Sequence, residues 1–356
     1  VQLSQTVSPE VMFEDYAYYS SFADTILQHA RENAHRLITA RELGPDSLVV
    51  EVASNDGYLL RNFAEKGIPV LGIDPARGPA DAAEALGIPT LRAFFGPELA
   101  AQLRSEGRLA DVVIANNVLA HVPDLNGFVA GIASVLKDDG VAVIEVPYAR
   151  DLIEHREFDT IYHEHLCYFS VSALNDLFAR HDLTLNEVEH YPIHGGSLRL
   201  YLGLKSEVGR SVRSYLQSEA EGGLLQHDYY RSFAAEVRDT QAALLELLRS
   251  LRAQGKRIAA YGAAAKGTVL LNSSGIGSEL IDFVVDRNVH KQGLFMPGVH
   301  IPIHDPLGLV TEKPDYTLIL SWNFKDEIIR QQEDYVRAGG RFIVPVPYPS
   351  IIEPLS

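Results

Sequence analysis

Residues 48–57 constrain the fold of this chain more than any other stretch. A short apolar run passes through Glu51 directly into the loop Ala53-Ser-Asn-Asp-Gly57. Small residues and a glycine let a ligand approach the backbone where a buried strand joins the next helix. A second apolar run ends in Asp74, whose carboxylate can accept both hydroxyl protons of an adenosine ribose. We therefore expect a parallel sheet with a ligand site at the ends of its strands.

Short apolar runs alternate with helix-compatible stretches in both halves of the chain. Because such runs are typical of parallel strands buried on both faces, they predict two α/β domains built on doubly wound sheets. A helix over 22–43 is expected before the first strand, since Gly44-Pro45 is a common helix stop. The expected strands are residues 48–52, 70–73, 111–115, 141–146 and 197–204, then 257–261, 280–285, 316–321 and 341–346.

The length of 356 residues also indicates more than one domain, because a single core stops growing at roughly 250–300 residues. Residues 1–20 are rich in Tyr and Phe but too irregular for a helix, and they are expected to pack over another part of the protein. The predicted parts are an aromatic lid segment (1–20), a cofactor domain (21–205) with a His- and Tyr-rich active-site insertion (151–200), a helical connector (206–253) and a second α/β domain (254–356).

Composition excludes several classes of partner. The chain has 31 Lys and Arg against 47 Asp and Glu, and this net charge of −16 disfavours a nucleic acid polymer. No apolar run approaches the roughly 20 residues of a membrane span, and the first 20 residues lack a secretory pattern, so a cytoplasmic protein is expected. The single cysteine, Cys167, excludes an internal disulfide and any site that needs several thiolates.

The loop after the first strand favours a cationic ligand. The dinucleotide pattern G-x-G-x-x-G is absent, and acidic and amide side chains occupy the place where a pyrophosphate needs neutral or positive surroundings. With residues 111–122 and Leu136-Lys-Asp-Asp-Gly140 in order behind it, the loop resembles that of class I methyltransferases, which use S-adenosylmethionine and release S-adenosylhomocysteine. It has one glycine where that family commonly has two or three. The cofactor candidates are Glu51, Ser54, Asn55, Asp56, Gly57, Asp74 and Asn116.

A dense group of His and Tyr residues lies at 158–170, with His121 and His194 elsewhere in the chain. Two imidazoles of a His-Glu-His sequence can share one face of a strand, but zinc needs three or four ligands and no thiolate pair is available, so no metal is expected. A second interpretation is that these side chains only fill a domain interface. The third is general acid–base catalysis, for which a pKa of about 6.5 suits histidine.

Six ordered motifs resemble the nucleotide-sugar C-methyltransferases that methylate C3 of 4-keto-deoxysugars in antibiotic pathways. The resemblance covers nearly the whole chain. Members usually begin with a small zinc domain of four cysteines, which is expected to be missing or truncated here. The matching stretches are residues 16–21, 54–57, 116–121, 161–165, 194–199 and 261–268.

The resemblance implies roles for individual residues. It makes His165 the catalytic base, with Tyr162, Glu164, His121 and Tyr16 around it. It also implies that the C-terminal domain binds the nucleotide, in agreement with the second α/β pattern. The HEHLCYF sequence is shared with uncharacterised relatives, so the reaction is better defined than the substrate.

The loop after residue 261 is the expected nucleotide site. Its amides and Lys266 can hold a diphosphate at a helix N-terminus, although a plain strand–helix turn also explains the pattern. Asp286 and Lys291 can face the nucleoside, and Trp322 with Asn323 can stack on and pair with a base. The substrate candidates are His194, Ser197, Arg199, Gly262, Lys266, Thr268, Asp286, Lys291, Trp322 and Asn323.

Three functions are consistent with these patterns. The first is C-methylation of a nucleotide-linked 4-keto sugar, in which His165 removes the proton next to the ketone and the resulting enolate takes the methyl group. The second is methylation of oxygen or nitrogen on another nucleotide- or carrier-linked molecule. The third is a nucleotide-binding module without turnover, against which the crowded His and Tyr segment argues.

Overall fold

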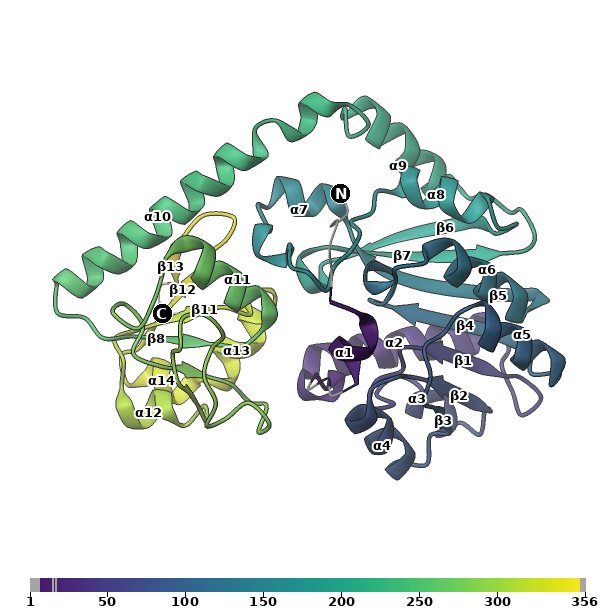
Figure 1. The fold of residues 1–356 in the computed structure, drawn as a ribbon, viewed down its shortest axis with the longest axis horizontal. Coiled ribbons are helices and arrows are strands. Elements are labelled where there is room, and N and C mark those ends of the chain that lie inside the picture. Colours follow the sequence, from purple (N-terminus) through teal and green to yellow (C-terminus); the bar gives the residue numbers. More distant parts are fainter. Residues whose placement is uncertain (1–6, 15, 17, 353–356) are drawn as a thin grey trace. The chain divides into compact units, whose positions relative to one another are not determined.

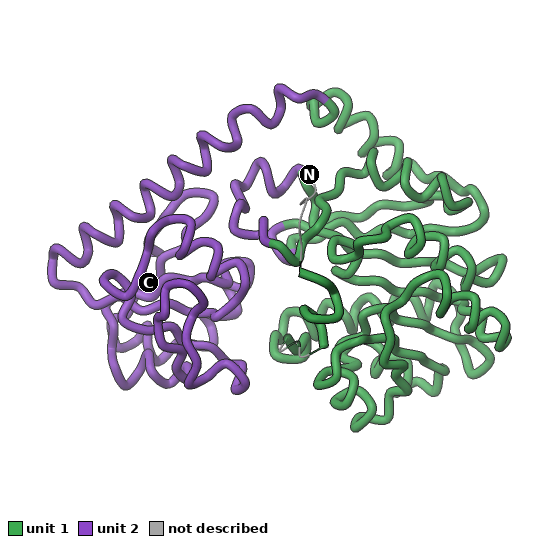
Figure 2. Tube along the Cα trace, viewed as in Figure 1, with its two compact units in different colours: residues 1–149, 163–192, 196–225 green, residues 150–162, 193–195, 226–356 purple. Residues whose placement is uncertain are grey.

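The computed structural model describes residues 7–14, 16 and 18–352, so residues 1–6, 15 and 17 of the predicted lid lie outside the described part. The chain divides into two compact units, shown in green and purple in Figure 2. Unit 1 comprises residues 1–149, 163–192 and 196–225, and unit 2 comprises residues 150–162, 193–195 and 226–356. This division splits the predicted connector between the units and places residues 150–162 with the second one.

Unit 1 is built on a mixed sheet with the strand order β3-β2-β1-β4-β5-β7-β6 (Figure 1). The strands from β3 to β5 run parallel, whereas β7 is antiparallel to both of its neighbours. Carboxyl ends of parallel strands meet at one edge, where ligands bind in sheets of this kind. The strands are β1 Val49–Val52, β2 Val70–Ile73, β3 Thr90–Leu91, β4 Ala110–Asn116, β5 Leu136–Pro147, β6 Thr184–Tyr191 and β7 Ser197–Gly203.

Helices cover both faces of the unit 1 sheet. Alternate residues such as Val50 and Val113 join one apolar core with side chains of α5, α6 and α8, as expected for strands with two buried faces. Helix α2 covers the other face and buries Ile26, Ala30 and Leu37 at helical spacing. The helices are α1 Pro9–Phe13, α2 Asp24–Ala40, α3 Arg61–Ala64, α4 Arg77–Ala85, α5 Pro97–Ser105, α6 Leu125–Val135, α8 Val171–Ala179 and α9 Arg210–Glu221, with short 3₁₀ helices η1 Ser20–Phe22 and η2 Leu119–His121.

Unit 2 has its own sheet, in the order β10-β9-β8-β11-β12-β13. Among the strands that the structure describes in this unit, only β12 and β13 pair in antiparallel fashion. The strands are β8 Ile258–Tyr261, β9 Val284–Val285, β10 Ile303–His304, β11 Tyr316–Ile319, β12 Arg341–Val344 and β13 Ser350–Ile352; the helices are α7 Ala149–Glu154, which begins at the unit boundary, α10 Phe233–Ala253, α11 Ala265–Ser274, α12 Gly308–Glu312, α13 Lys325–Gln331 and α14 Glu333–Arg337, with η3 Phe158–Thr160, η4 Ile193–Gly195, η5 His227–Tyr230 and η6 Trp322–Phe324.

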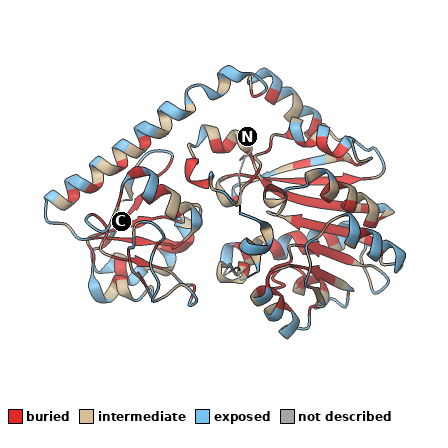
Figure 3. Ribbon diagram, viewed as in Figure 1, coloured by how far each residue is buried: buried red, intermediate tan, exposed pale blue. Residues whose placement is uncertain are grey.

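The predicted α/β class with two sheets is confirmed, and Figure 3 shows the strands of both units largely in the colour of buried residues. Two local predictions were wrong, and one long strand was not predicted. The lid segment contains a short helix, α1, whose first residue is a proline, a residue suited to the first helical turn. The long helix expected across 206–253 is interrupted after α9 by Gly222 and Gly223, the latter with φ 76°. Strand β6 was missed, because polar residues alternate along its solvent side.

No helix in the described ranges is long and apolar enough to cross a membrane. The longest, α10, carries charged residues along its whole length and buries only the stripe Thr240, Leu244, Leu248 and Leu251.

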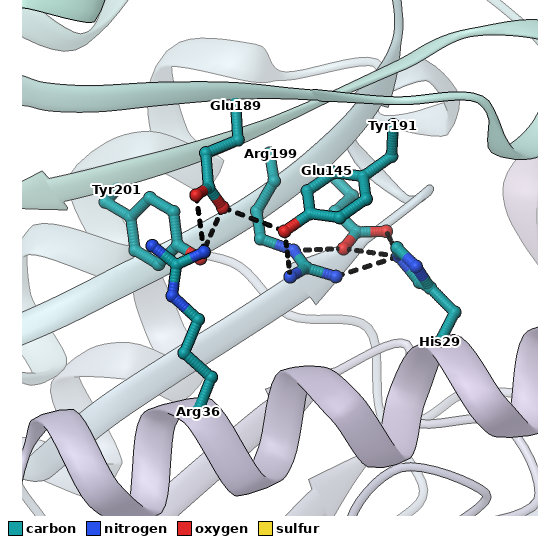
Figure 4. A network of polar contacts seen from close by, with 7 residues as sticks. All are labelled: His29, Arg36, Glu145, Glu189, Tyr191, Arg199 and Tyr201. Carbon is teal, nitrogen blue, oxygen red and sulfur yellow. Dashed lines mark hydrogen bonds and ion pairs between the residues drawn. The ribbon is translucent and has the colours of Figure 1, made fainter.

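A buried polar network holds α2 against the sheet (Figure 4). Both carboxylate oxygens of Glu145, on β5, lie 2.9 and 3.0 Å from Nε2 of His29, on α2. Arg199, the residue opposite Glu145 on β7, donates through Nε to the same carboxylate at 2.5 Å and through Nη1 to the Tyr191 hydroxyl at 3.1 Å. Glu145 and Arg199 are each 2% exposed, so each charge depends on the other for compensation.

The pKa of Glu145 reflects the positive charges around its carboxylate. Burial alone would raise that pKa, but His29 and Arg199 hold it below its ordinary value. A carboxylate with a depressed pKa contributes stability above its unfolded pKa and loses that stability as the pH falls through the folded value. The network therefore stabilises unit 1 at neutral pH and weakens in acid.

We expect Arg199→Met to lower the free energy of unfolding by about 3 kcal/mol, because it leaves a buried carboxylate with only His29 as partner. The matched control is Arg92→Met, which breaks an exposed pair with Asp81 and should cost less than about 1 kcal/mol. Urea denaturation followed by far-UV circular dichroism measures both changes. Equal losses in the two variants would contradict the role assigned to Arg199.

Candidate active site

Asp74 lies at the carboxyl end of β2, beside the loop that follows β1. Its Oδ2 accepts the N–H of Asn55 at 2.8 Å and its Oδ1 accepts the N–H of Ala76 at 2.8 Å. Burial raises the pKa of Asp74, and these two hydrogen bonds oppose that rise. Each carboxylate oxygen has a further lone pair for a ligand hydroxyl, so the geometry fits the predicted contact with a ribose.

Several buried oxygens around this loop have no hydrogen-bond partner among the residues that the structure describes. Buried polar atoms are normally paired, so such a group marks a place for a missing ligand or water. All of these atoms can accept hydrogen bonds, which suits a ligand with an ammonium, a sulfonium and ribose hydroxyls, as the predicted S-adenosylmethionine has. They are both carboxylate oxygens of Glu51, Ser54 Oγ, Asp56 Oδ1 and Asn116 Oδ1.

Glu51 is the most deeply buried of these acids, at 1% exposed. Burial raises its pKa well above the ordinary value, and the carboxylates of Asp74 and Asp56 add to the rise. A positively charged group bound nearby would lower that pKa again and stabilise the carboxylate. The acidic side chains around the loop therefore favour a ligand that carries a positive charge.

The loop backbone is unusual at three positions. Gly57 has φ 74°, but Ala53 and Asn55 also take left-handed values, 57° and 49°. Although the loop has only one glycine, two of its other residues also take the left-handed backbone conformation that glycine usually supplies. The loop also packs closely on β2, where a Cβ on Gly72 would lie 2.5 Å from Ser54 Oγ.

The side chains of Asn55 and Asp56 have partners that the sequence did not suggest. Asn55 Oδ1 accepts the N–H of Ser20 at 2.8 Å, and its Nδ2 donates to the Tyr18 carbonyl at 3.0 Å. Asp56 Oδ2 accepts the N–H of Ser21 at 3.2 Å. Both predicted cofactor residues thus hold the N-terminal segment.

The histidines predicted for acid–base work meet beside the end of β4. The rings of His121, on η2, and His165 have centroids 4.9 Å apart at 66°. The carbonyl of Ala120 accepts the N–H of Leu166 at 2.7 Å and that of Cys167 at 3.3 Å. The backbone of the 163–168 segment is therefore fixed to η2, and this places His165 against His121.

The N-terminal segment reaches the same histidines. The Tyr16 hydroxyl donates to Glu164 Oε2 at 3.2 Å, and the Phe13 ring lies edge-on to His121 with centroids 5.7 Å apart. Four of the five predicted catalytic residues are thus brought together in unit 1. The fifth, Tyr162, belongs to unit 2, and its role stays a prediction.

Burial lowers the pKa of His121 to about 4, although a hydrogen bond with the Glu164 backbone opposes this shift. Its Nδ1 is enclosed and has no partner in the described part of the chain. His121 is therefore neutral at physiological pH. A neutral neighbour does not repel the positive charge that His165 would acquire on taking up a proton.

Unit 2 repeats the arrangement of Asp74. Asp286 follows β9, its Oδ2 accepts the N–H of Ala263 at 2.6 Å, and its Oδ1 accepts the N–H of Asn288 at 2.7 Å. In both sheets, the aspartate accepts one N–H from the loop after the neighbouring strand, β1 or β8, and one from the residue two positions further along its own chain. Lys291, a second predicted residue, donates from Nζ to the Ala263 carbonyl at 2.8 Å.

Lys266 lies among carboxylates that the sequence did not connect with it. Its Nζ donates to Asn323 Oδ1 at 2.8 Å and lies 4.5 Å from the centre of the Trp322 ring. Burial raises the pKa of Glu157 to about 7 and that of Asp159 to about 6, and the nearby Lys266 charge opposes both shifts. These acids disfavour a phosphate at Lys266, so its phosphate role stays a prediction.

Two predicted substrate residues are buried and have partners within their own unit, and their substrate roles stay predictions. Trp322 is 8% exposed, and its Nε1 donates at 2.7 Å to the fully buried Asp159, so the ring packs in the core of unit 2. Arg199 is 2% exposed and is enclosed with Glu145. Both predictions came from residue type alone, which does not indicate whether a side chain is buried.

The other predicted substrate residues are divided between the units. Ser197, 1% exposed, begins β7 in unit 1. In unit 2, His194 packs edge-on against Phe324 with centroids 5.8 Å apart. Gly262 has φ 99°, and a Cβ there would lie 2.2 Å from Ser321 Oγ, while Thr268 lies in the first turns of α11.

The sequence analysis missed His29, Phe13 and the backbone of Ser20. His29 gives no local signal, because its partners are 116 and 170 residues away. The Ser20 contact is made by a main-chain N–H, which no side-chain pattern reveals. Within the described ranges, no three His, Cys, Asp or Glu residues are grouped so that they could hold a metal ion.

Comparison with known proteins identifies both halves of the chain. A methyltransferase domain model matches residues 24–188, and a model described as the C-methyltransferase C-terminal domain matches residues 192–347. The C-methyltransferase NovU of Streptomyces niveus is 37% identical over 353 residues, which cover 98% of this chain and 84% of NovU.

Solved structures of other methyltransferases match about half of the chain. The magnesium protoporphyrin IX methyltransferase of Synechocystis PCC 6803 with bound SAM is 16% identical, with a TM-score of 0.39, over 49% of this chain and 78% of that one. A putative methyltransferase of Bacillus halodurans is 13% identical, with the same TM-score, over 49% of this chain and its own full length. Neither likeness bears on the substrate.

The predicted class I methyltransferase domain is confirmed by the family model together with the sheet of unit 1, and the methyl donor of that class is S-adenosylmethionine. The second matched model accounts for the separate sheet of unit 2. With a full-length relative at 37% identity, this chain belongs to the C-methyltransferase family.

Proposed function

We propose that this C-methyltransferase transfers the methyl group of S-adenosylmethionine to C3 of a nucleotide-linked 4-keto-deoxysugar, with His165 as the base. The observation that carries the proposal is the group of His121, His165, Glu164 and Tyr16 beside the end of β4. It lies in the same unit as the Asp74 loop, so cofactor and base belong to one compact body.

Bound S-adenosylmethionine supplies an electrophilic methyl group on a sulfonium. Its ammonium and ribose hydroxyls would be held by Glu51 and Asp74, whose oxygens have acceptor capacity to spare. The protein's part is to generate a carbon nucleophile. A ketone acidifies the adjacent C–H bond, so a nearby base can remove that proton and leave an enolate.

In the proposed step, a ring nitrogen of His165 takes the proton from C3, and the C–H electron pair moves into the enolate. The enolate carbon would then form the new C–C bond with the methyl group as the methyl–sulfur bond breaks, and the electron pair of that bond would leave with the sulfur of S-adenosylhomocysteine. The developing negative charge on the ketone oxygen needs a hydrogen-bond donor in a water-poor site. Tyr16, Tyr162 and His121 are the candidate donors, and the packing of Phe13 against His121 supports exclusion of water from the histidines.

Methylation of oxygen or nitrogen on another nucleotide- or carrier-linked molecule is the second candidate. The same His165 would then deprotonate a heteroatom. The C-methyltransferase description of the closely matching NovU favours carbon, and the NMR spectrum of the product distinguishes a methyl on carbon from one on oxygen or nitrogen.

The nucleotide part of the acceptor is proposed to bind unit 2 at Asp286. The support is the repeated geometry, because Asp286 makes the same two kinds of backbone contact as Asp74 and has acceptor capacity for a hydroxyl of the nucleotide sugar. The loop that Asp286 binds through Ala263 leads into α11, and the amides at the start of this helix can bind a phosphate. The sugar, its pathway and the expected cytoplasmic location stay predictions.

His165→Asn is expected to reduce methyl transfer at least about 100-fold, the size of a typical general-base contribution, while S-adenosylhomocysteine affinity changes less than about two-fold. The matched control is His163→Asn, since His163 is exposed and belongs to the same His-Glu-His sequence. Turnover is measured as S-adenosylhomocysteine release. Substantial turnover of the His165 variant would remove it as the base.

The two repeated aspartates allow a paired test. Asp74→Asn should weaken S-adenosylhomocysteine binding about ten-fold and leave deoxythymidine diphosphate binding unchanged, because a hydrogen bond to a charged group is worth about 1.5–3 kcal/mol. Asp286→Asn should do the reverse. Calorimetric titration of both ligands into each variant measures the four affinities. The diphosphate should also slow hydrogen exchange of residues 262–268 and 286–291. If it does not, the nucleotide site is wrong.

A further inference from the structure

The side chain of Asn55 joins the cofactor loop to the N-terminal segment. Both ends of its amide are used, Oδ1 by the N–H of Ser20 and Nδ2 by the Tyr18 carbonyl. The side chain is 8% exposed, so water does not compete effectively for these bonds. Asp56 adds a parallel contact to Ser21.

Asn55 is also tied to the proposed ribose ligand. Its own N–H donates to Asp74 Oδ2 at 2.8 Å, and its φ of 49° is left-handed. Glycine takes this conformation without cost, whereas asparagine is the side chain that tolerates it best. An asparagine here keeps the loop geometry that a glycine would allow and adds two hydrogen bonds to the N-terminal segment.

The segment held by Asn55 extends to the acid–base cluster. Four residues before Ser20, Tyr16 donates to Glu164 at 3.2 Å, and Phe13 packs on His121. Three hydrogen bonds to residues 18–21 therefore anchor the part of the segment nearest the loop, and the aromatic contacts place its other end at the histidines.

We propose that Asn55 is a positioning residue that couples cofactor binding to the placement of Tyr16 at Glu164. A ligand on Asp74 and Glu51 restrains the loop, and the restrained loop holds residues 18–21 in place. Coupling between two equilibria is reciprocal, so losing the contacts to the segment must weaken cofactor binding by the same factor. The inference rests on the cofactor part of the proposed function and is independent of the acceptor.

Ser20→Pro tests the coupling from the segment side without altering the loop. Proline removes the N–H that Asn55 accepts. The backbone tolerates it, because Ser20 is the first residue of η1 and Tyr19 before it is extended, with φ −121° and ψ 117°. Asn55→Gly tests the coupling from the loop side, since glycine keeps the left-handed backbone and removes only the two side-chain hydrogen bonds to Ser20 and Tyr18.

Arg210→Pro is the matched control for the proline. Arg210 is the first residue of α9 in unit 1, exposed, and preceded by the extended Gly209. This variant should behave as the wild type in every measurement below. It separates a local loss of contacts from any general effect of a proline at a helix start.

The measurement is hydrogen exchange of residues 18–22 with and without S-adenosylhomocysteine, together with the affinity for that ligand. In the wild type we expect the ligand to slow exchange about five-fold or more. Ser20→Pro removes one of the three hydrogen bonds and Asn55→Gly removes two, so the protection should decrease in both variants, more in Asn55→Gly, and the affinity should fall by a similar factor. Exchange elsewhere in unit 1 should be unchanged, which a merely destabilised protein would not show.

Binding of S-adenosylhomocysteine without protection of residues 18–22 would overturn the coupling alone. Unchanged affinity in Asn55→Gly would also overturn it, because reciprocity would be violated. Absence of any binding by the wild type would overturn the proposed cofactor site and the coupling together.

Discussion

Hydrogen bonding of one carboxylate to two backbone N–H groups sets the geometry of each sheet edge. Asp74 binds Asn55 and Ala76 in unit 1, and Asp286 binds Ala263 and Asn288 in unit 2. Asp74 is buried and Asp286 is partly buried, and removing a carboxylate from water is costly unless hydrogen bonds compensate it. The same contacts that compensate the charge also fix the loop that a ligand must approach, so stability and ligand geometry depend on one interaction.

The strand ends of the methyltransferase sheet could be predicted from sequence, because the relevant signals are local. Apolar runs define the strands, and a carboxylate at the end of such a run, such as Glu51 or Asp74, lies at the ligand edge by topology alone. The burial of Arg199 could not be predicted in this way. Its burial depends on β7 inserting antiparallel beside β5, which sets Arg199 opposite Glu145, 54 residues away in the chain.

The residues around Lys266 show a second limit of sequence reasoning. A lysine in a glycine-containing loop after a strand suggests a phosphate site, and nothing near it in the chain argues otherwise. The carboxylates that change the electrostatics, Glu157 and Asp159, come from a segment more than 100 residues earlier that belongs to the same compact unit. Lys266 therefore compensates buried acids of its own unit, which leaves Asp286 as the stronger candidate for nucleotide recognition.

The low glycine content of the cofactor loop has a physical explanation in the same terms. Ala53 and Asn55 take left-handed backbone values that glycine takes freely, and such a conformation costs roughly 1–2 kcal/mol for other residues. Each hydrogen bond returns about 1 kcal/mol, so the two bonds of the Asn55 amide are enough to offset its own strain. A glycine at this position would relax the loop but remove two of the three hydrogen bonds that connect it to residues 18–21. The departure from the usual glycine pattern is thus consistent with a loop that binds the cofactor on one side and the N-terminal segment on the other.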